Sequence, residues 1–241
     1  MSLKTEMKEK TKLEFTKLKQ MSWKDKIWYI FEYYKIHMLV IFLLGCLIYL
    51  IASTIYRQTF NDVLYCAFIN NYGYGDMNTE YFEEGFHEYG NFGKKDLVTT
   101  DSSMTLHYGN RDSEDEDSVS LSSMTTSESD YASTMKISAM VAAKSLDVVI
   151  MDSTTMEGFS SQGMVADIES ILPADLYASL SDRIFYGTKE DGTKFPCGIQ
   201  MSGTNLETIG NIHIEDPVFS VIANTQNPEN TVLFLRYLLG E

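Results

Sequence analysis

The sequence predicts a single membrane-spanning helix followed by an α/β domain built on a mostly parallel sheet. Two observations support this prediction. Residues 36–56 contain no Asp, Glu, Lys or Arg. After them, short apolar segments alternate with segments whose apolar residues repeat at helical spacing, a pattern typical of a parallel sheet covered by helices. About 180 residues follow the apolar run, which is enough for one domain with a sizeable core.

Charge is distributed unevenly along the chain. The net charge of −15 divides into +4 for residues 1–36, 0 for residues 37–56 and −19 for residues 57–241. An acidic domain without a basic groove repels phosphate backbones, so the composition argues against nucleic acid as a partner. Residues 1–35 are predicted to be a cytoplasmic juxtamembrane segment, either solvated or lying along the anionic inner leaflet.

The apolar run at residues 36–56 is long enough to cross a lipid bilayer. As a helix it spans about 31 Å, which matches the hydrocarbon core. Aromatic residues that suit the headgroup level flank it on both sides: Trp23, Trp28, Tyr29, Tyr33, Tyr34, Tyr56 and Phe60. Lysines are concentrated on the N-terminal side. The positive-inside rule therefore places the N-terminus in the cytoplasm and residues 57–241 outside.

Two processing alternatives are weaker than an uncleaved signal anchor. The LLGC motif at residues 43–46 resembles a bacterial lipoprotein signal, in which Cys46 would be lipidated. The apolar run continues for ten residues past Cys46, whereas a lipidated cysteine normally begins a polar tether. Cleavage after Ala52 or Ser53 by a general signal peptidase is disfavoured by the large residues at 50–51.

The first elements of the domain follow directly. Residues 63–69 (VLYCAFI) are apolar and bounded by polar residues, which predicts a buried strand. A helix should begin at Asn78 or Thr79 and end at Gly90, because aromatic residues repeat between them at helical spacing. Residues 97–100 predict a second, shorter strand.

Residues 109–130 are rich in acidic residues and serine, which predicts a solvated loop. Their spacing does not fit a calcium-binding loop, which needs a Gly at its sixth position and a Glu at its twelfth. No metal site is predicted here. A helix should begin at Ser129 or Asp130 and lead into a strand at residues 146–151, whose polar C-terminal end starts with Asp152.

The C-terminal half contains recognisable start and stop signals. A helical stretch leads to Gly163, and Pro173 opens a short helix. Residues 186–200 predict a hairpin around the turn at 190–192. A last buried strand covers residues 218–223. The final helix is predicted to begin with Asn227 as its cap and Pro228 in its first turn, and to end at Gly240.

Residues 130–240 resemble bacterial extracellular solute-binding proteins of transporters. The resemblance rests on an Asp-Val-Val strand, a Gly-x-x-x-Asp-Ile step, a Leu-Pro helix start, a Phe-Pro-x-Gly-Ile strand and a late Asn-Pro-Glu helix start. The matching positions are Asp147, Val148, Val149, Asp152, Gly163, Asp167, Ile168, Leu172, Pro173, Phe195, Pro196, Gly198, Ile199, Asn224, Asn227, Pro228, Glu229, Phe234 and Leu235. The resemblance implies a type II periplasmic-binding-protein-like fold, anchored in a bacterial cell membrane. Such proteins usually need two lobes and about 300 residues, so this domain would be a reduced form.

If a ligand cleft is present, it should lie at the C-terminal ends of the parallel strands, where ligands bind in open α/β sheets. The candidate ligand-binding residues are Asn70, Asn71 and Tyr72 after the first strand, Asp101, Ser102 and Ser103 after the second, and Asp152, Ser153 and Thr154 after the third. Ordinary turn and cap chemistry is the alternative explanation for each of them.

Catalysis finds little support in the sequence. It contains no nucleophile elbow, no zinc-protease motif and no phosphate-binding loop. Glu84 and His87 have the spacing of a helical metal motif, but no matching motif occurs elsewhere. No catalytic residue and no cofactor is therefore predicted. Cys66 and Cys197 could form a disulfide outside the cell or remain as buried free thiols.

Two functional hypotheses remain open. In the first, the domain is a membrane-anchored solute-binding module associated with a transporter, and it captures a small solute. In the second, a reduced domain has lost its ligand pocket and acts as an accessory or interaction subunit of a membrane complex, for example with a transporter permease. The first predicts a polar cleft. The second predicts a filled cleft and an exposed apolar patch.

Overall fold

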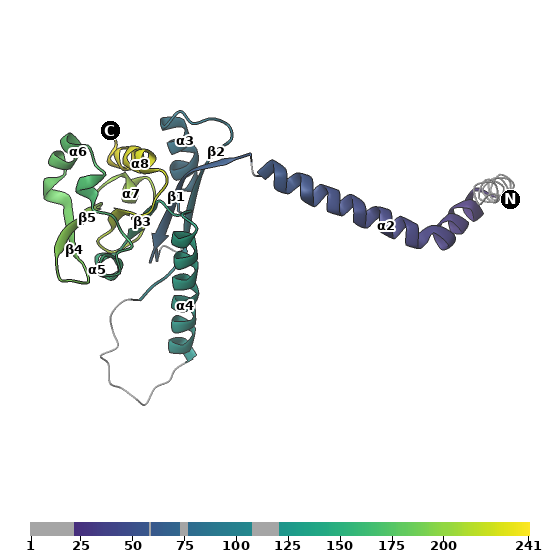
Figure 1. Ribbon diagram of the computed structural model, residues 1–241, viewed down its shortest axis with the longest axis horizontal. Helices are drawn as coiled ribbons and strands as arrows, with labels where there is room; N and C mark the ends of the chain where they lie inside the picture. The colour runs from purple at the N-terminus through teal and green to yellow at the C-terminus, as the bar shows by residue number, and fades with distance from the viewer. Residues whose placement is uncertain (1–21, 58, 73–76, 108–120) are drawn as a thin grey trace. The chain divides into compact units, whose positions relative to one another are not determined.

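The computed structural model describes residues 22–57, 59–72, 77–107 and 121–241. The chain divides into two compact units, Met1–Thr59 and Phe60–Glu241. The first unit contains helix α2 (Trp23–Arg57), drawn in purple and blue in Figure 1. Its part Lys35–Arg57 has a mean hydropathy of 2.6 and is not buried. The apolar run is therefore confirmed as part of a helix that is long and apolar enough to cross a membrane.

The second unit is built on one six-stranded sheet with the strand order β2-β1-β3-β6-β5-β4. The strands are β1 (Asn61–Ile69), β2 (Asp96–Met104), β3 (Val148–Met151), β4 (Ile184–Thr188), β5 (Lys194–Gln200) and β6 (Val218–Val221). Strand β1 runs parallel to both β2 and β3. Strand β6 is antiparallel to β3 and β5, and β4 is antiparallel to β5. The unit is thus an α/β domain on a mixed sheet.

The prediction of a mostly parallel sheet was wrong. The β4–β5 hairpin reverses the chain, as its turn residues predicted. Strand β6 then starts where β5 finishes, with Gln200 opposite Val218 and the Met201 amide donating to the Pro217 carbonyl at 2.8 Å. The segment between them therefore acts as a long hairpin connection rather than a crossover, and only a crossover keeps neighbouring strands parallel.

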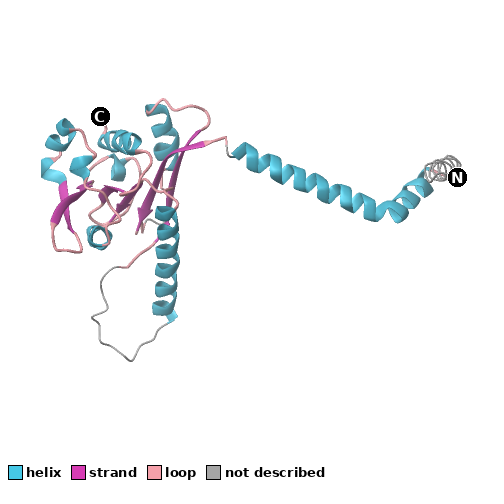
Figure 2. Cartoon of the chain, viewed as in Figure 1, coloured by secondary structure: helices cyan, strands magenta, loops and turns pink. Residues whose placement is uncertain are grey.

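Helices cover both faces of this sheet (Figure 2). In chain order they are the π-helical turn η1 (Tyr81–Gly85), α3 (Phe86–Tyr89), α4 (Leu121–Ala142), α5 (Ser153–Ser161), η2 (Ile168–Ser170), α6 (Ala174–Ser179), η3 (Ser181–Arg183), α7 (Asn205–Thr208) and α8 (Pro228–Leu239). The two apolar clusters of the core lie on opposite faces of the sheet.

Strand β1 shows how the sequence builds both clusters. Its side chains alternate between the two faces of the sheet, as the pleat requires. Leu64, Cys66 and Phe68 join the cluster under η1, α3, α6, α7 and α8. Ala67 and Ile69 join the cluster under α4 and α5. All five are fully buried, which explains why this segment is an uninterrupted apolar run.

Helix α4 begins earlier than the sequence predicted. Residues 109–120 of the predicted acidic, serine-rich loop lie outside the described residues, but residues 121–130 are helical. Near its predicted start, this helix contacts the residue after β2 through serine hydroxyls instead of apolar side chains. The Ser129 hydroxyl lies 3.0 Å from that of Thr105, and the Ser133 hydroxyl accepts from the Thr105 amide at 3.2 Å. A search for apolar residues at helical spacing could not predict this part of the helix.

The other predicted helix boundaries are close to those observed. Asn78 caps the η1–α3 helix, since its Oδ1 accepts from the Tyr81 amide at 3.1 Å. Helix α8 has Pro228 in its first turn and ends at Gly240, whose φ of 82° requires the left-handed region that glycine adopts readily. Asn227 occupies the cap position of α8, but its side chain makes no capping hydrogen bond.

Candidate functional site

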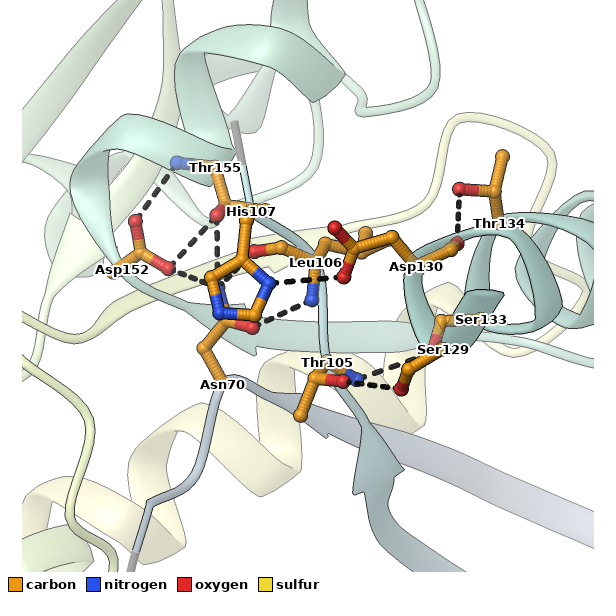
Figure 3. Close-up of polar contacts among 10 residues, drawn as sticks. All are labelled: Asn70, Thr105, Leu106, His107, Ser129, Asp130, Ser133, Thr134, Asp152 and Thr155. Carbon is orange, nitrogen blue, oxygen red and sulfur yellow. Dashed lines mark hydrogen bonds and ion pairs between the residues drawn. The ribbon is translucent and has the colours of Figure 1, made fainter. Parts of the chain in front are cut away.

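The carboxyl ends of β1 and β3 meet at one edge of the sheet, because these strands are parallel neighbours. Asn70 directly follows β1 and is only 3% exposed, with a φ of 62°. Its Oδ1 accepts from the Leu106 amide at 2.7 Å. Its Nδ2 lies 2.7 Å from the Leu106 carbonyl, 2.7 Å from Asp152 Oδ2 and 3.0 Å from Thr155 Oγ1 (Figure 3). The Asn70 side chain is therefore fully engaged within the protein.

Asp152 begins helix α5 and acts as its cap. Its Oδ1 accepts from the Thr155 amide at 2.9 Å, and its Oδ2 accepts from the Thr155 hydroxyl at 2.8 Å. This is ordinary capping geometry. Thr155 is 1% exposed. Of the other candidates in this stretch, Ser153 is half-buried and Thr154 is exposed on the first turn of α5.

Asn71 and Tyr72 join the end of β1 to the loop before β6. Asn71 Oδ1 accepts from the His213 amide at 2.9 Å, and the Tyr72 amide donates to the His213 carbonyl at 3.2 Å. The Tyr72 ring is 56% exposed and lies 6.5 Å, centroid to centroid, from the His107 ring. Burial, followed by the charges of the nearby acidic residues, raises the pKa of Tyr72. Tyr72 therefore remains protonated near neutral pH.

Two contacts near this edge were not predicted from the sequence: the His107–Asp130 pair and the bonds of Thr155. His107 Nδ1 lies 2.9 Å from Asp130 Oδ1, which joins the segment after β2 to helix α4 (Figure 3). No sequence signal connects them, since they are 23 positions apart across an acidic segment. Thr155 was also missed; its amide and its hydroxyl both donate to the capping Asp152 carboxylate.

The candidates on β2 do not reach this cluster. Asp101 lies inside β2, which continues to Met104 rather than ending near residue 100. It accepts hydrogen bonds from Tyr65 at 3.1 Å and Lys136 at 2.5 Å, and its Oδ1 accepts from the Ser103 amide at 2.8 Å. The Ser103 hydroxyl is 3.1 Å from the Lys136 ammonium. Ser102 is half-buried on the same strand.

This group fastens helix α4 to the sheet. Burial by itself raises the pKa of Asp101, but hydrogen bonds from Lys136 and Ser103 outweigh it and lower that pKa to about 2. Burial, with a further contribution from the Asp101 charge, raises the pKa of Tyr65 to about 12. Both groups thus keep one protonation state near neutral pH, which suits a structural contact.

Cys66 and Cys197 are both free, buried thiols. They belong to the two different apolar clusters and so lie on opposite faces of the sheet. Burial raises the pKa of both, that of Cys197 to about 11. Neither thiol is therefore activated as a nucleophile. Within the described residues, no group of three or more His, Cys, Asp or Glu side chains is placed to hold a metal ion.

A pocket of about 790 Å³ lies at the opposite end of the sheet. Val165 lines this pocket and forms a β-bridge with Ile222. Ile222 comes directly after Val221, which pairs with Val148, so the pocket lies at the end of the sheet where β3 begins. The end of α5 and the β4–β5 hairpin complete the wall. Sequence reasoning missed this pocket because it looked for a site only where the parallel strands end.

Comparisons with protein-family models, with curated proteins and with solved structures give no match to this chain, and nothing in them identifies a solute-binding protein.

Proposed function

We propose that this chain is a single-pass protein of a bacterial cell membrane whose domain outside the cytoplasm is an accessory or interaction subunit of a membrane complex, such as one containing a transporter permease. One observation carries the proposal. Of the polar side chains expected to bind a solute at the ends of β1 and β3, Asn70 and Asp152 bond to each other, and Asn71 bonds to the His213 backbone. Asn70 alone contacts the Leu106 backbone, Asp152 and Thr155, and it is nearly inaccessible.

The proposed membrane location and orientation rest on the N-terminal unit. A 23-residue apolar helix can span the bilayer, and the lysines that precede it favour a cytoplasmic N-terminus. An acidic domain on the outer side is consistent with this orientation, since only positive charge near the helix ends controls topology.

Cysteine labelling in intact cells tests the orientation. Lys94 and Lys24 are both exposed, whereas Cys66 and Cys197 are buried and should not react. In a Cys46→Ala background, we expect a membrane-impermeant maleimide to label Lys94→Cys in intact cells and Lys24→Cys only after lysis. Labelling of Lys24→Cys in intact cells, with Lys94→Cys protected until lysis, would reverse the topology.

The domain exposes an apolar pair that a partner could cover. On helix α4, Tyr131 is 67% exposed and Met135 is 54% exposed. Residues four positions apart lie on the same side of a helix, so the two side chains form one continuous apolar surface. Their helix is anchored from its other side by Ile137 and by the Lys136–Asp101 ion pair.

Site-specific photo-crosslinking tests this surface. A benzophenone amino acid in place of Met135, in the full-length chain in its native membrane, should give one discrete adduct with another membrane protein. The same group in place of the exposed Glu229, which begins helix α8 in another part of the domain, is the matched control and should give none. Equal adducts from both positions, or none from Met135, would contradict the interaction role. An adduct with a second copy of the chain would replace it with self-association.

Solute binding is the second candidate function, and the pocket of about 790 Å³ favours it. Pockets that hold small ligands usually have volumes of about 300–1,000 Å³. In this candidate the solute site lies at the hairpin end of the sheet, away from the edge that contains Asn70 and Asp152.

A further inference from the structure

We propose that the hairpin-end pocket binds a small organic cation through an alkylammonium group, and that Lys189 competes with this ligand for the same place. The inference rests on the second candidate function, solute binding, and it names the class of solute. The pocket lies between the stretch that runs on from the end of helix α5, the β4–β5 hairpin and Ala223 after β6, so three separate parts of the chain form its wall.

The charge of the pocket wall favours a cation. Asp167, Glu190 and Asp191 line it, against the single cationic side chain of Lys189 among its lining residues. Helix α5 ends at Ser161, which also lines the pocket, and the C-terminal end of a helix carries partial negative charge. A cleft lined by one sign of charge concentrates ligands of the opposite sign.

An aromatic face supplies the second recognition element. The Phe195 ring is 5% exposed and belongs to the apolar core, so it is held rigidly while it lines the pocket. The Lys189 ammonium lies over this ring, 4.9 Å from its centroid. An ammonium group at this distance is attracted by the electrons of the ring face. The position of Lys189 thus shows that an ammonium group fits over the Phe195 ring.

Lys189 is positioned to be displaced. It is exposed, it lies in the hairpin turn, and its chain is held there by backbone hydrogen bonds to Thr193 and Gly192 rather than by burial of its side chain. A ligand ammonium could take its place over Phe195 and gain the nearby carboxylates, while Lys189 returns to solvent. Removing the Lys189 side chain should therefore strengthen binding, which is the opposite of what loss of a ligand contact does.

Calorimetric titration of the full-length chain in detergent with putrescine tests the proposal, with glucose as the neutral comparator. We expect saturable binding of putrescine, tightened about tenfold by Lys189→Ala, since both the competing ammonium–ring contact and a competing positive charge are removed. Glu190→Gln should weaken it severalfold. Lys194→Ala, the same change of charge on a neighbouring exposed residue outside the pocket wall, should have a much smaller effect than Lys189→Ala.

The possible results separate this inference from the function on which it rests. Putrescine affinity that Lys189→Ala leaves unchanged, or changes no more than Lys194→Ala does, overturns the competition by Lys189. Binding of glucose without putrescine overturns the cationic class but keeps solute binding. An absence of binding by both probes, with a correctly folded chain by circular dichroism, overturns the inference and removes the support for solute binding at this pocket.

Discussion

Replacing Asp147 by Ala should destabilise the domain by about 3–5 kcal/mol, because several donors lose their acceptor, and this is a large fraction of the roughly 5–15 kcal/mol that holds a domain folded. Asp147 directly precedes β3 and is 2% exposed. Its carboxylate accepts hydrogen bonds from the Tyr65 amide at 2.9 Å, from the Thr225 hydroxyl and from the Asn227 amide group at 3.3 Å. Alanine would leave the Tyr65 amide and the Thr225 hydroxyl without this acceptor and the Asn227 amide group with only its bond to the Asp62 carbonyl, and a buried unpaired donor is costly.

Asp147→Asn is the informative companion to that variant. Asparagine keeps the shape of the side chain and one acceptor oxygen, but its NH₂ group faces the surrounding hydrogen-bond donors. We therefore expect an intermediate loss of about 2 kcal/mol in unfolding free energy. Urea unfolding of the full-length chain in detergent, followed by the fluorescence of the domain's tyrosines, measures both. Asp182→Ala, at an exposed position in η3, is the control and should change stability by less than about 0.5 kcal/mol. A loss no larger than the control for Asp147→Ala would contradict this account.

The parts of the fold that the sequence predicts correctly are those with local causes. The apolar helix follows from a run without charges. The β4–β5 hairpin follows from a turn that contains Gly192, whose φ is 82°. The bounds of α8 follow from Pro228 and Gly240. In each case a short stretch of chain contains its own physical reason, and no distant contact is needed.

The errors have non-local causes. The direction of β6 depends on where the chain re-enters the sheet, and strand–helix alternation does not determine this. Helix α4 is joined to Thr105, across an acidic segment, by polar contacts of Ser129 and Ser133. The position of Asp101 depends on how far β2 continues along β1. Because each of these is decided by a partner far away in the sequence, local pattern cannot supply it.

The candidate site divides in the same way. Placing Asn70 and Asp152 at one edge needed only the parallel pairing of β1 with β3, and the structure brings them into contact. Whether such side chains face a ligand or each other depends on how the segments that carry them pack together in three dimensions. That property is absent from a list of polar residues, and it distinguishes a binding cleft from a cap.

Substitution of Asn70 should distinguish these two roles directly. We expect Asn70→Ala to cost about 3–4 kcal/mol, because it leaves the buried Leu106 amide unpaired, removes the bond to Asp152 and places a side chain with a β-carbon but no amide at a φ of 62°. Asn70→Gly should recover about 1 kcal/mol of this loss, since glycine adopts the left-handed region without strain. Asn70→Asp should be at least as damaging as Ala, because it would set a carboxylate against Asp152.

Whether Asn70→Ala raises or lowers the unfolding free energy distinguishes a binding site from a structural contact. Residues kept for a ligand are often held at a cost to stability, so replacing them commonly stabilises the protein. Residues that hold a fold together destabilise it when replaced. If Asn70→Ala raises the unfolding midpoint in urea, the edge formed by Asn70 and Asp152 is a binding site after all, and the accessory role loses the observation that supports it. If the midpoint falls as expected, and Thr155→Val lowers it too, the polar groups at this edge serve to lock β1, β3 and α5 together.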